Sequence, residues 1–445
     1  MGLVLAALDD VDLREISRAV SSDLRERNVT FGAADGAGED TFVVDPVPRL
    51  IGGEAWDALA AGLAQRARAL ECFVADVYGE RLIVAAGVVP WRVIEGAEFF
   101  EPRMAQLPPA GKRWITIAGL DVVRDDDGPF MVLEDNVRTP SGIAYAFAAR
   151  DALSGHVPVP DSVRVRSLEP AYELLAEALR AAAAPQASKD PTIVVLTDGP
   201  SNSAHYEHRA IADRLGLPLV RLEDLSVRSD RLLASTDDGV VAVDVVYRRT
   251  DEDRLFDAAG SRTTLADVLL GPLEAQTVAC VNAFGTGVAD DKLVHSYVEE
   301  MVRFYLGEEP LLASVPTHDP TRPGVLEMTL DRIAEVVVKP RSGHGGIGVV
   351  VGPRSDAQTL NEISRELAVN PERFIVQETV QLSRQPTVCG DVLEPRHVDL
   401  RPFTFATKDR IEVFPGGLTR VALERGSLVV NSSQRGGAKD TWVLA

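Results

Sequence analysis

Apolar residues recur at helical spacing in the first part of the chain, and the pattern predicts two helices. Residues 11–27 are typical of a surface helix. Residues 54–78 predict a longer helix, in which these apolar residues fall close to helical spacing: Trp56, Leu59, Leu63, Leu70, Phe73 and Val77. We expect that side of the longer helix to face a core.

Two apolar segments further along predict β-strands, at residues 113–124 and 129–137. The sequence Asp-Asp-Asp-Gly at 125–128 lies between them and indicates a turn. The two strands are therefore expected to form a β-hairpin.

Polar side chains occupy every second position at the end of the second predicted strand. Glu134, Asn136 and Arg138 therefore share one face. Asp121 joins that face if the hairpin loop has two or four residues, whereas an odd loop points it away. Asp135 lies on the opposite face, where we expect replacement by Asn to be tolerated.

The middle of the chain alternates strands with helices. Residues 192–225 predict a strand, a polar loop, a helix and a second strand, which is a βαβ unit and so part of a parallel sheet. Residues 240–250 predict a single strand. Residues 282–312 predict a glycine loop and then one helix, which begins near Lys292.

The last third is rich in β-structure. Residues 334–352 predict a strand, a glycine loop and another strand, and further strands are expected at 373–380, 397–405 and 426–434. The polar segment "PQASKDP" at 185–191 marks a domain boundary.

Composition narrows the class of protein. The chain has 445 residues, too many for one compact core, and a net charge of −21. That charge argues against nucleic acid or an anionic membrane as a partner, because both reward basic surfaces. The three scattered cysteines suggest no disulfide framework, and no segment resembles a signal peptide or a transmembrane helix, so a cytoplasmic protein is expected.

The sequence "KPRSGHGGIG" is the first candidate for chemistry. Glycines at 343, 345, 346 and 348 let backbone N–H groups approach phosphate oxygens, and Lys339 just before them supplies a positive charge. It is not a Walker loop, because no Gly-Lys-Ser/Thr follows and the next segment is a strand. Taken alone, a glycine-rich hairpin without a ligand explains it equally well.

Other polar residues are less informative by themselves. Lys292 is more often a solvated charge than a ligand, and His205 and His208 are assigned no metal. His397, Asp399 and Arg401 alternate along one predicted strand and so share a face. Asp121, Glu134 and Asn136 offer the oxygen atoms that Mg²⁺ prefers.

Together these parts resemble an ATP-grasp protein, in which two α+β lobes hold ATP. The motif Glu134-x-Asn136 precedes Lys339 and the glycine loop here, the reverse of the usual order, which indicates a permutation. Over residues 28–445 the chain resembles the circularly permuted ATP-grasp proteins related to glutathionylspermidine synthase. The resemblance is carried by segments such as "GLDVVRDDDG", "VLEDNVRTPSGIAYAFAAR", "VYRRTDED", "GTGVADDK", "VVKPRSGHGGIG" and "EPRHVDLRPFTF".

The resemblance implies an α/β fold in three parts. Residues 1–185 and 291–445 would build the permuted ATP-grasp domain from both chain ends, around a central parallel-sheet domain at 186–290. It also implies the site residues: Asp121, Glu134 and Asn136 for magnesium; Lys292, Lys339, Gly343, Gly345, Gly346, Gln377 and Glu378 for ATP; and Arg401, Arg420 and Arg138 for catalysis.

The function that these expectations favour is an ATP-dependent carboxylate–amine ligase with ATP and Mg²⁺ as cofactors. ATP would phosphorylate a carboxylate of a small molecule or peptide, and an amine would attack the acyl phosphate to give an amide, ADP and phosphate. Two alternatives stay open. One is a nucleotide-binding subunit that acts with a partner protein, and the other is a small-molecule kinase.

Overall fold

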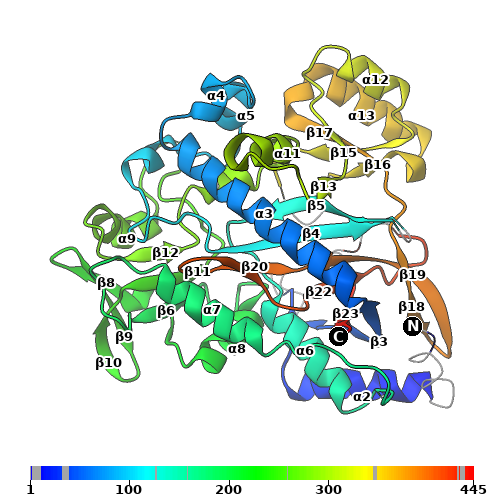
Figure 1. The fold of residues 1–445 in the computed structure, drawn as a ribbon, viewed down its shortest axis with the longest axis horizontal. Helices are drawn as coiled ribbons and strands as arrows, with labels where there is room; N and C mark the ends of the chain where they lie inside the picture. Colours follow the sequence, from blue (N-terminus) through cyan, green and yellow to red (C-terminus); the bar gives the residue numbers. More distant parts are fainter. Residues whose placement is uncertain are drawn as a thin grey trace.

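The computed structural model describes residues 2, 12–32, 40–125, 128–157, 159–257, 259–343, 348–427, 430 and 436–445. At its centre is a ten-stranded sheet, whose main path runs β13-β5-β4-β19-β22-β23-β3 (Figure 1). Its strands are β3 (Val44–Ile51), β4 (Ile117–Arg124), β5 (Phe130–Asn136), β13 (Ala313–Ser314), β18 (Arg384–Cys389), β19 (Val392–Arg401), β20 (Phe403–Ala406), β21 (Ile411–Val413), β22 (Leu418–Val421) and β23 (Gly437–Val443). Strands from both ends of the chain are neighbours in this sheet: β4 pairs with β19 and β20, and β3 pairs with β23 in parallel. The expected fold built from both chain ends is confirmed.

The predicted hairpin is present as β4 and β5, with one irregularity that matters. Arg124 pairs with Phe130, so residues 125–129 form a connection of odd length. Such a connection would turn Asp121 away from Glu134. However, the register shifts between Val122 and Asp121, and Asp121 pairs with Glu134. This β-bulge brings the two carboxylates to one face of the sheet.

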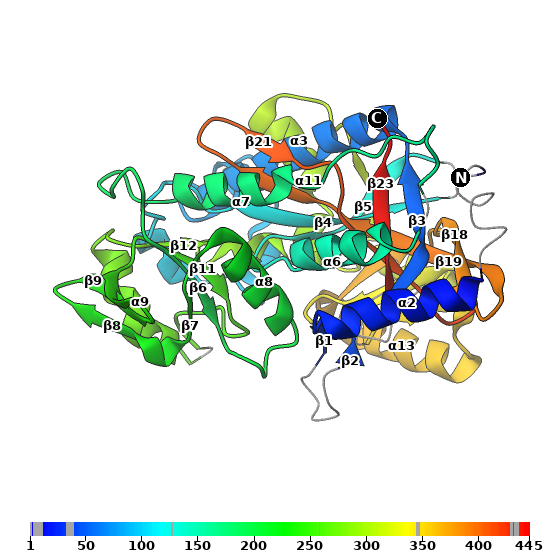
Figure 2. The same cartoon turned by 90° about the horizontal axis from the view of Figure 1, so that it is seen from below.

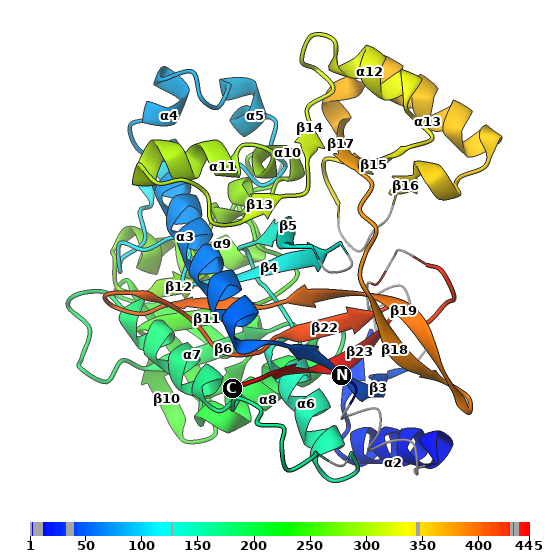
Figure 3. The same cartoon turned by 45° about the vertical axis from the view of Figure 1, so that its right-hand side comes forward.

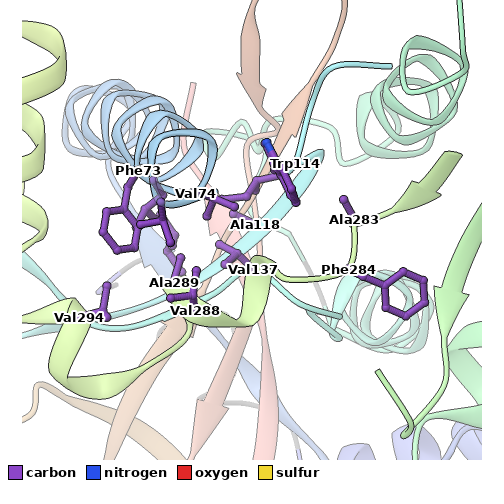
Figure 4. Packing of buried hydrophobic residues seen from close by; sticks show 14 of the residues in the cluster. Phe73, Val74, Trp114, Ala118, Val137, Ala283, Phe284, Val288, Ala289 and Val294 are labelled. Atoms are coloured by element: carbon purple, nitrogen blue, oxygen red, sulfur yellow. The ribbon is translucent and has the colours of Figure 1, made fainter. Parts of the chain in front are cut away.

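Helices cover both faces of the large sheet. Helix α3 (Gly53–Val77) lies on one face, and α6 (Ile143–Ser154) on the other (Figure 2). Phe73 and Val74 of α3 pack in the same core as Ala118 of β4 (Figure 4). The longer predicted helix and its buried side are confirmed.

The predicted surface helix is also present, as α2 (Leu13–Glu26). Asp12 caps it by accepting hydrogen bonds from the backbone of Arg14 and Glu15. The described residues of the first 190 positions also form α4 (Leu82–Ala85), α5 (Trp91–Glu95), η1 (Pro102–Gln106) and α7 (Pro170–Ala181). Strands β1 (Thr30–Phe31) and β2 (Asp40–Thr41) form a small separate pair.

A four-stranded sheet in the order β12-β11-β6-β7 confirms the predicted parallel sheet. Its elements are β6 (Ile193–Thr197), α8 (His205–Leu215), β7 (Leu219–Val220), β11 (Val245–Arg249), α9 (Thr264–Glu274) and β12 (Ala279–Val281). The exposed sheet beside it is antiparallel and consists of β8 (Leu225–Arg228), β9 (Arg231–Thr236) and β10 (Gly239–Ala242), with η2 (Leu222–Asp224) before it.

The single strand predicted at 240–250 is wrong, because the segment is divided between these two sheets. β10 ends at Ala242 and β11 begins at Val245. At the junction, the carboxylate of Asp244 accepts hydrogen bonds from the backbone N–H of Thr192 (3.0 Å) and from Arg231 (3.3 Å). Asp244 thus fixes the chain where it passes from one sheet to the other.

A smaller lobe stands over β13 and the β4–β5 hairpin (Figure 3). It contains β14 (Thr317–His318), α12 (Val325–Asp331), β15 (Val336–Pro340), β16 (Val350–Val351), η5 (Gly352–Arg354), α13 (Ala357–Val369), η6 (Pro371–Arg373) and β17 (Phe374–Glu378). Val336, Val338 and Val376 face the two α-helices in one core. Lys339 and Gln377 therefore lie on the other face, toward the large sheet.

Three predictions from the second half need correction or remain outside the description. The helix predicted within 282–312 is instead a series of short pieces, η3 (Thr286–Ala289), α10 (Lys292–His295), α11 (Val298–Met301) and η4 (Val302–Leu306), because the backbone leaves the helical region at Tyr297 (φ −112°, ψ 2°). The strand predicted at 397–405 is broken at Pro402, which has no N–H to donate. Most of 426–434 lies outside the described residues.

Within the part of the chain that is described, no helix has the length and apolar character needed to cross a membrane.

Candidate functional site

A cavity of about 470 Å³ lies between the smaller lobe and the large sheet. Among its lining residues are all the predicted site residues that the structure describes: Asp121, Glu134, Asn136, Arg138, Lys292, Lys339, Gly343, Gln377, Glu378, Arg401 and Arg420. Gly345 and Gly346 lie outside the described residues. Positions separated by up to about 300 residues in the sequence are thus brought to one place.

One wall of the cavity is apolar. It is formed by Leu133, Val315, Val337, Val349, Val351, Val380, Leu382 and Val430. Gln377 is buried beside this wall, and its Nε2 donates to Thr317 Oγ1 (2.8 Å). Glu378 accepts two hydrogen bonds from Arg332 (3.0 and 2.9 Å), and these hold the pKa of Glu378 below its usual range. Such a wall suits a flat apolar group such as a purine ring.

Two lysines also line the cavity, and both have few partners. Lys339 Nζ lies 3.9 Å from Glu134 Oε1, and its side chain is 10% exposed. Among the described residues, no acceptor lies within hydrogen-bond distance of this ammonium, and burial lowers its pKa. Lys292 Nζ donates to the carbonyl of Gly343 (2.7 Å), so it lies at the start of the glycine loop. A buried ammonium without a hydrogen-bonded acceptor is costly, and Lys339 therefore favours an anionic ligand.

Glu134 and Asn136 point their side chains into the cavity from β5. The Glu134 side chain is 33% exposed, and Lys339 is its nearest cation. The amide of Asn136 has a buried nitrogen without a partner among the described residues. Because the assignment of an amide's oxygen and nitrogen can be exchanged, this side chain can turn its oxygen to a ligand. The two residues fit one hard cation as oxygen donors.

Asp121 lies beside them but is already occupied. Its carboxylate accepts from Arg401 (2.5 and 2.9 Å) and from Arg420 (2.8 Å). Burial alone would raise the pKa of Asp121, yet the two guanidinium groups outweigh it and hold the pKa at about 2. As described, Asp121 therefore positions the two arginines, and its role as a magnesium ligand stays a prediction.

Asp399 completes this cluster. Arg420 Nε donates to Asp399 Oδ1 (2.8 Å), and Arg49 donates to the Asp399 backbone carbonyl (2.9 Å). Asp399 and Arg401 both line the cavity, as their shared face predicts. His397, the third residue of that face, instead donates through Nδ1 to the Leu382 carbonyl (2.7 Å).

Arg138 is fixed by groups that the sequence did not single out. Its guanidinium donates to Asp290 (2.7 Å) and Asp253 (2.6 Å), and it lies 3.7 Å from the centre of the Phe99 ring. Burial works to lower the pKa of Arg138, but the two carboxylates raise it above its ordinary value. Arg138 is therefore a rigid cation at one end of the cavity.

Arg341 is a further cavity residue that the sequence analysis missed. It donates to both oxygens of Asp291 (3.0 and 2.8 Å), and Asp291 also caps α10 through the backbone of Leu293 (2.9 Å). This pair joins the end of β15 to the helix that carries Lys292. The period-two spacing of Lys339 and Arg341 is the signal that could have found it.

Asp135 lies on the face opposite Glu134, as predicted, but that face is not solvated. Its carboxylate is buried and accepts two hydrogen bonds from Arg66 of α3 (2.6 and 2.8 Å) and one from His295 (2.7 Å). Burial alone would raise the pKa of Asp135, but Arg66 and the hydrogen bond with His295 outweigh it and hold the pKa below its usual range. These contacts argue against the expectation that Asn is tolerated at position 135.

These features together define a class of protein. A small β-rich lobe stands over a larger sheet, and the cavity between them has apolar lining residues, a buried lysine and the oxygen donors of Glu134 and Asn136. The two-lobed arrangement is that of an ATP-grasp enzyme, an ATP-dependent ligase in general terms.

The chain belongs to one particular branch of that class: the model of the circularly permuted ATP-grasp family, type 2, matches residues 48–422. ATP and Mg²⁺ are the cofactors that ATP-grasp proteins generally use. The solved structure of a glutathione synthetase-like effector from Globodera pallida, in its apo form, shares the fold, with a TM-score of 0.61 at 12% identity over 96% of both chains.

Curated relatives are similar over most of this chain. An uncharacterized protein from Synechocystis sp. is 44% identical over 91% of this chain and 85% of its own length. A protein from Frankia casuarinae named "putative glutamate–cysteine ligase 2-2" is 43% identical over 95% of this chain. The match covers only 49% of the Frankia protein, so this chain corresponds to about half of it.

Proposed function

We propose that this protein is an ATP-dependent carboxylate–amine ligase that works through an acyl phosphate. A substrate carboxylate oxygen attacks the γ-phosphorus of ATP, and the bond to the β-phosphate oxygen breaks to release ADP. An amine then attacks the carbonyl carbon of the acyl phosphate, and inorganic phosphate leaves as the amine gives up a proton. The products are an amide, ADP and phosphate.

The observation that carries the proposal is the Lys339 ammonium. It is a buried cation in a large cavity, with a single carboxylate at 3.9 Å and no hydrogen bond to a described residue. An ammonium has three N–H donors, so a polyphosphate supplies the acceptors that the protein itself does not.

Each part of the cavity then has a role. The apolar wall and Gln377 would hold adenine, and Lys339 and Lys292 would bind the phosphates. Arg401 and Arg420, fixed by Asp121 and Asp399, would stabilise charge on the transferred phosphoryl group, and Arg138 would orient the acyl phosphate.

Glu134 and Asn136 would hold Mg²⁺, with Asp121 as the third predicted ligand. The ion would neutralise charge on the ATP phosphates. No side-chain nucleophile is required, because positioning and electrostatics account for catalysis of this kind. The division into residues 1–185, 186–290 and 291–445 belongs to the same proposal.

The names of relatives suggest which substrates to test first. Two Frankia proteins, from F. casuarinae and F. alni, are named as putative glutamate–cysteine ligases, and each is about twice as long as the matched region. Amino acids are therefore the first pool to examine, as both carboxylates and amines.

The test is ADP release with Mg-ATP and pools of carboxylates and amines, supplied together and separately. Release that needs both pools is expected. Release with carboxylates or alcohols alone would indicate a kinase instead, and nucleotide binding without release under any condition would indicate a binding subunit. Lys339→Met is the control, since it should abolish ADP release whichever pool is active.

A further inference from the structure

Behind Lys339 lies a second, much smaller chamber. Its volume is about 10 Å³, and Glu134, Asp135, Lys292, His295, Lys339 and Gln377 are among the residues that line it. That volume is close to the minimum that one water molecule needs, and a buried water also needs two to four polar partners. The chamber therefore has the size and the lining of a water site.

His295 supplies an unused polar atom at this chamber. Its side chain is 3% exposed, and Nε2 is buried without a hydrogen-bond partner among the described residues. Nδ1 lies 2.7 Å from Asp135 Oδ2. Arg66 Nη2 also lies 3.1 Å from Nδ1, so Nδ1 is engaged by both neighbours and Nε2 is the ring atom left for a further hydrogen bond.

The ring is held rigidly in this orientation. Arg66 fixes Asp135 from α3 by two hydrogen bonds and also donates to Ser314 Oγ (3.0 Å). Lys292 and His295 stand three residues apart on α10 and both line the chamber. Nε2 points away from Asp135, since Nδ1 is the atom that faces that carboxylate.

We propose that His295 is a positioning residue that holds Lys339 in place through one buried water. The water is hydrogen-bonded to His295 Nε2, donates to the Glu134 carboxylate and accepts from Lys339 Nζ. A rigid chain then runs from Arg66 through Asp135, His295 and the water to the ammonium. This inference rests on the proposed function, in which Lys339 binds the ATP phosphates.

Two amide substitutions test the contacts of the two ring nitrogens one at a time. An Asn side chain places its NH₂ group near the position of Nδ1, so His295→Asn keeps the donor to Asp135 and loses the contact with the water. A Gln side chain reaches the position of Nε2, so His295→Gln keeps a polar atom for the water and weakens the contact with Asp135. If His295 only supported the fold, the order of ATP affinities would be reversed: His295→Gln would bind ATP more weakly than His295→Asn.

The measurements are the Kd of Mg-ATP and the melting temperature of each variant. His295→Asn should bind Mg-ATP roughly fivefold more weakly while melting near the parent, as expected for the loss of about one hydrogen bond. His295→Gln should melt at a lower temperature and keep ATP affinity close to that of the parent. If His295→Asn binds ATP like the parent, or if affinity only follows melting temperature, the proposal is overturned.

A double-mutant cycle with Lys339→Met tests the route of the effect. In the Lys339→Met background, His295→Asn should no longer change ATP affinity, because the group that it positions is gone. An undiminished effect in that background would refute the water link.

Failure of the proposed function has a different signature. If Lys339→Met alone binds ATP like the parent, the assignment of the phosphate site is wrong, whatever His295 does. A high-resolution crystal structure of the parent protein then shows separately whether the water is present. Density between His295 Nε2 and Lys339 Nζ supports the inference, and its absence overturns it.

Discussion

The two faces of strand β5 carry adjacent carboxylates in opposite circumstances. Asp135 faces α3, its side chain is 1% exposed, and Arg66 and His295 satisfy its oxygens. Glu134 faces the cavity, its side chain is 33% exposed, and its one cation lies 3.9 Å away. A buried charge with all its partners holds the fold, whereas a charge with spare hydrogen-bonding capacity in a cavity is available to a ligand. The following substitutions test that difference.

The largest effect is expected for Asp135→Asn. It leaves the buried Arg66 guanidinium without its counter-charge, and breaking a buried pair costs about 3–5 kcal/mol of the free energy of unfolding. Denaturant unfolding at neutral pH measures this cost. The exposed Asp409→Asn is the matched control and should unfold like the parent. A loss below about 1 kcal/mol in Asp135→Asn would mean that the pair does not hold the fold.

The same residue should contribute to acid unfolding. The pKa of Asp135 is lowered in the folded protein, so its stabilising contribution is full above the ordinary aspartate pKa of about 4 and is lost as pH falls below that value. Unfolding of the parent and of Asp135→Asn should therefore be compared between neutral pH and pH 3. The two proteins should converge in stability as pH falls, and a constant difference would contradict the assignment.

On the cavity side, Lys339→Met should weaken Mg-ATP binding by about 1.5–3 kcal/mol, the range for a hydrogen bond to a charged group. Calorimetric titration with Mg-ATP measures the change. Melting temperature should not fall, because the substitution removes a buried cation that has no hydrogen bond to the described residues. Lys408→Met, at an exposed turn, provides the control. Equal ATP affinity in Lys339→Met and the parent would remove this lysine from the site.

Glu134→Gln should reduce turnover and leave the fold unchanged. It keeps the shape of the side chain but removes a charge from the proposed magnesium site, so about 10–100-fold of activity should be lost. Its free energy of unfolding should stay within about 0.5 kcal/mol of the parent, in contrast with Asp135→Asn. If Glu134→Gln instead unfolds as readily as Asp135→Asn, the two faces do not differ as described.

The smallest effect is expected for Asn136→Ala. Mg²⁺ keeps several waters and can replace a lost neutral ligand with another, so residual turnover should need only more magnesium. A magnesium titration of turnover measures this requirement, and Asn136→Asp, which restores an oxygen donor, should reduce it again. An unchanged magnesium requirement in Asn136→Ala would exclude the amide as a ligand.

Local patterns in the sequence predicted the faces of these strands, but not what each face meets. Side-chain alternation placed Glu134 and Asp135 on opposite sides of β5, and the structure confirms it. The partners of Asp135 lie 69 and 160 positions away along the chain, and no local pattern encodes such distant pairs. For that reason the sequence predicted that Asn would be tolerated, whereas the contacts of Asp135 predict the opposite.

The relation between Asp121 and Glu134 shows a second limit. Counting the loop alone would have turned Asp121 away, because the connection at 125–129 is odd. One extra residue in β5 restores the alignment, and a bulge has no clear signature in a single sequence. By contrast, the family resemblance compares whole segments, and the lysines, amide and arginines that it selected line one cavity.

The interleaved order of the large sheet also constrains how the protein is made. β3 and β23 are direct neighbours, although nearly the whole chain lies between them. During synthesis from the N-terminus, β3 must wait without this partner until residues 437–443 leave the ribosome. The smaller lobe and the parallel sheet pair strands that are closer in sequence and can form earlier. The nascent chain therefore exposes unpaired strand edges for most of its synthesis, which is when protection by a chaperone would matter most.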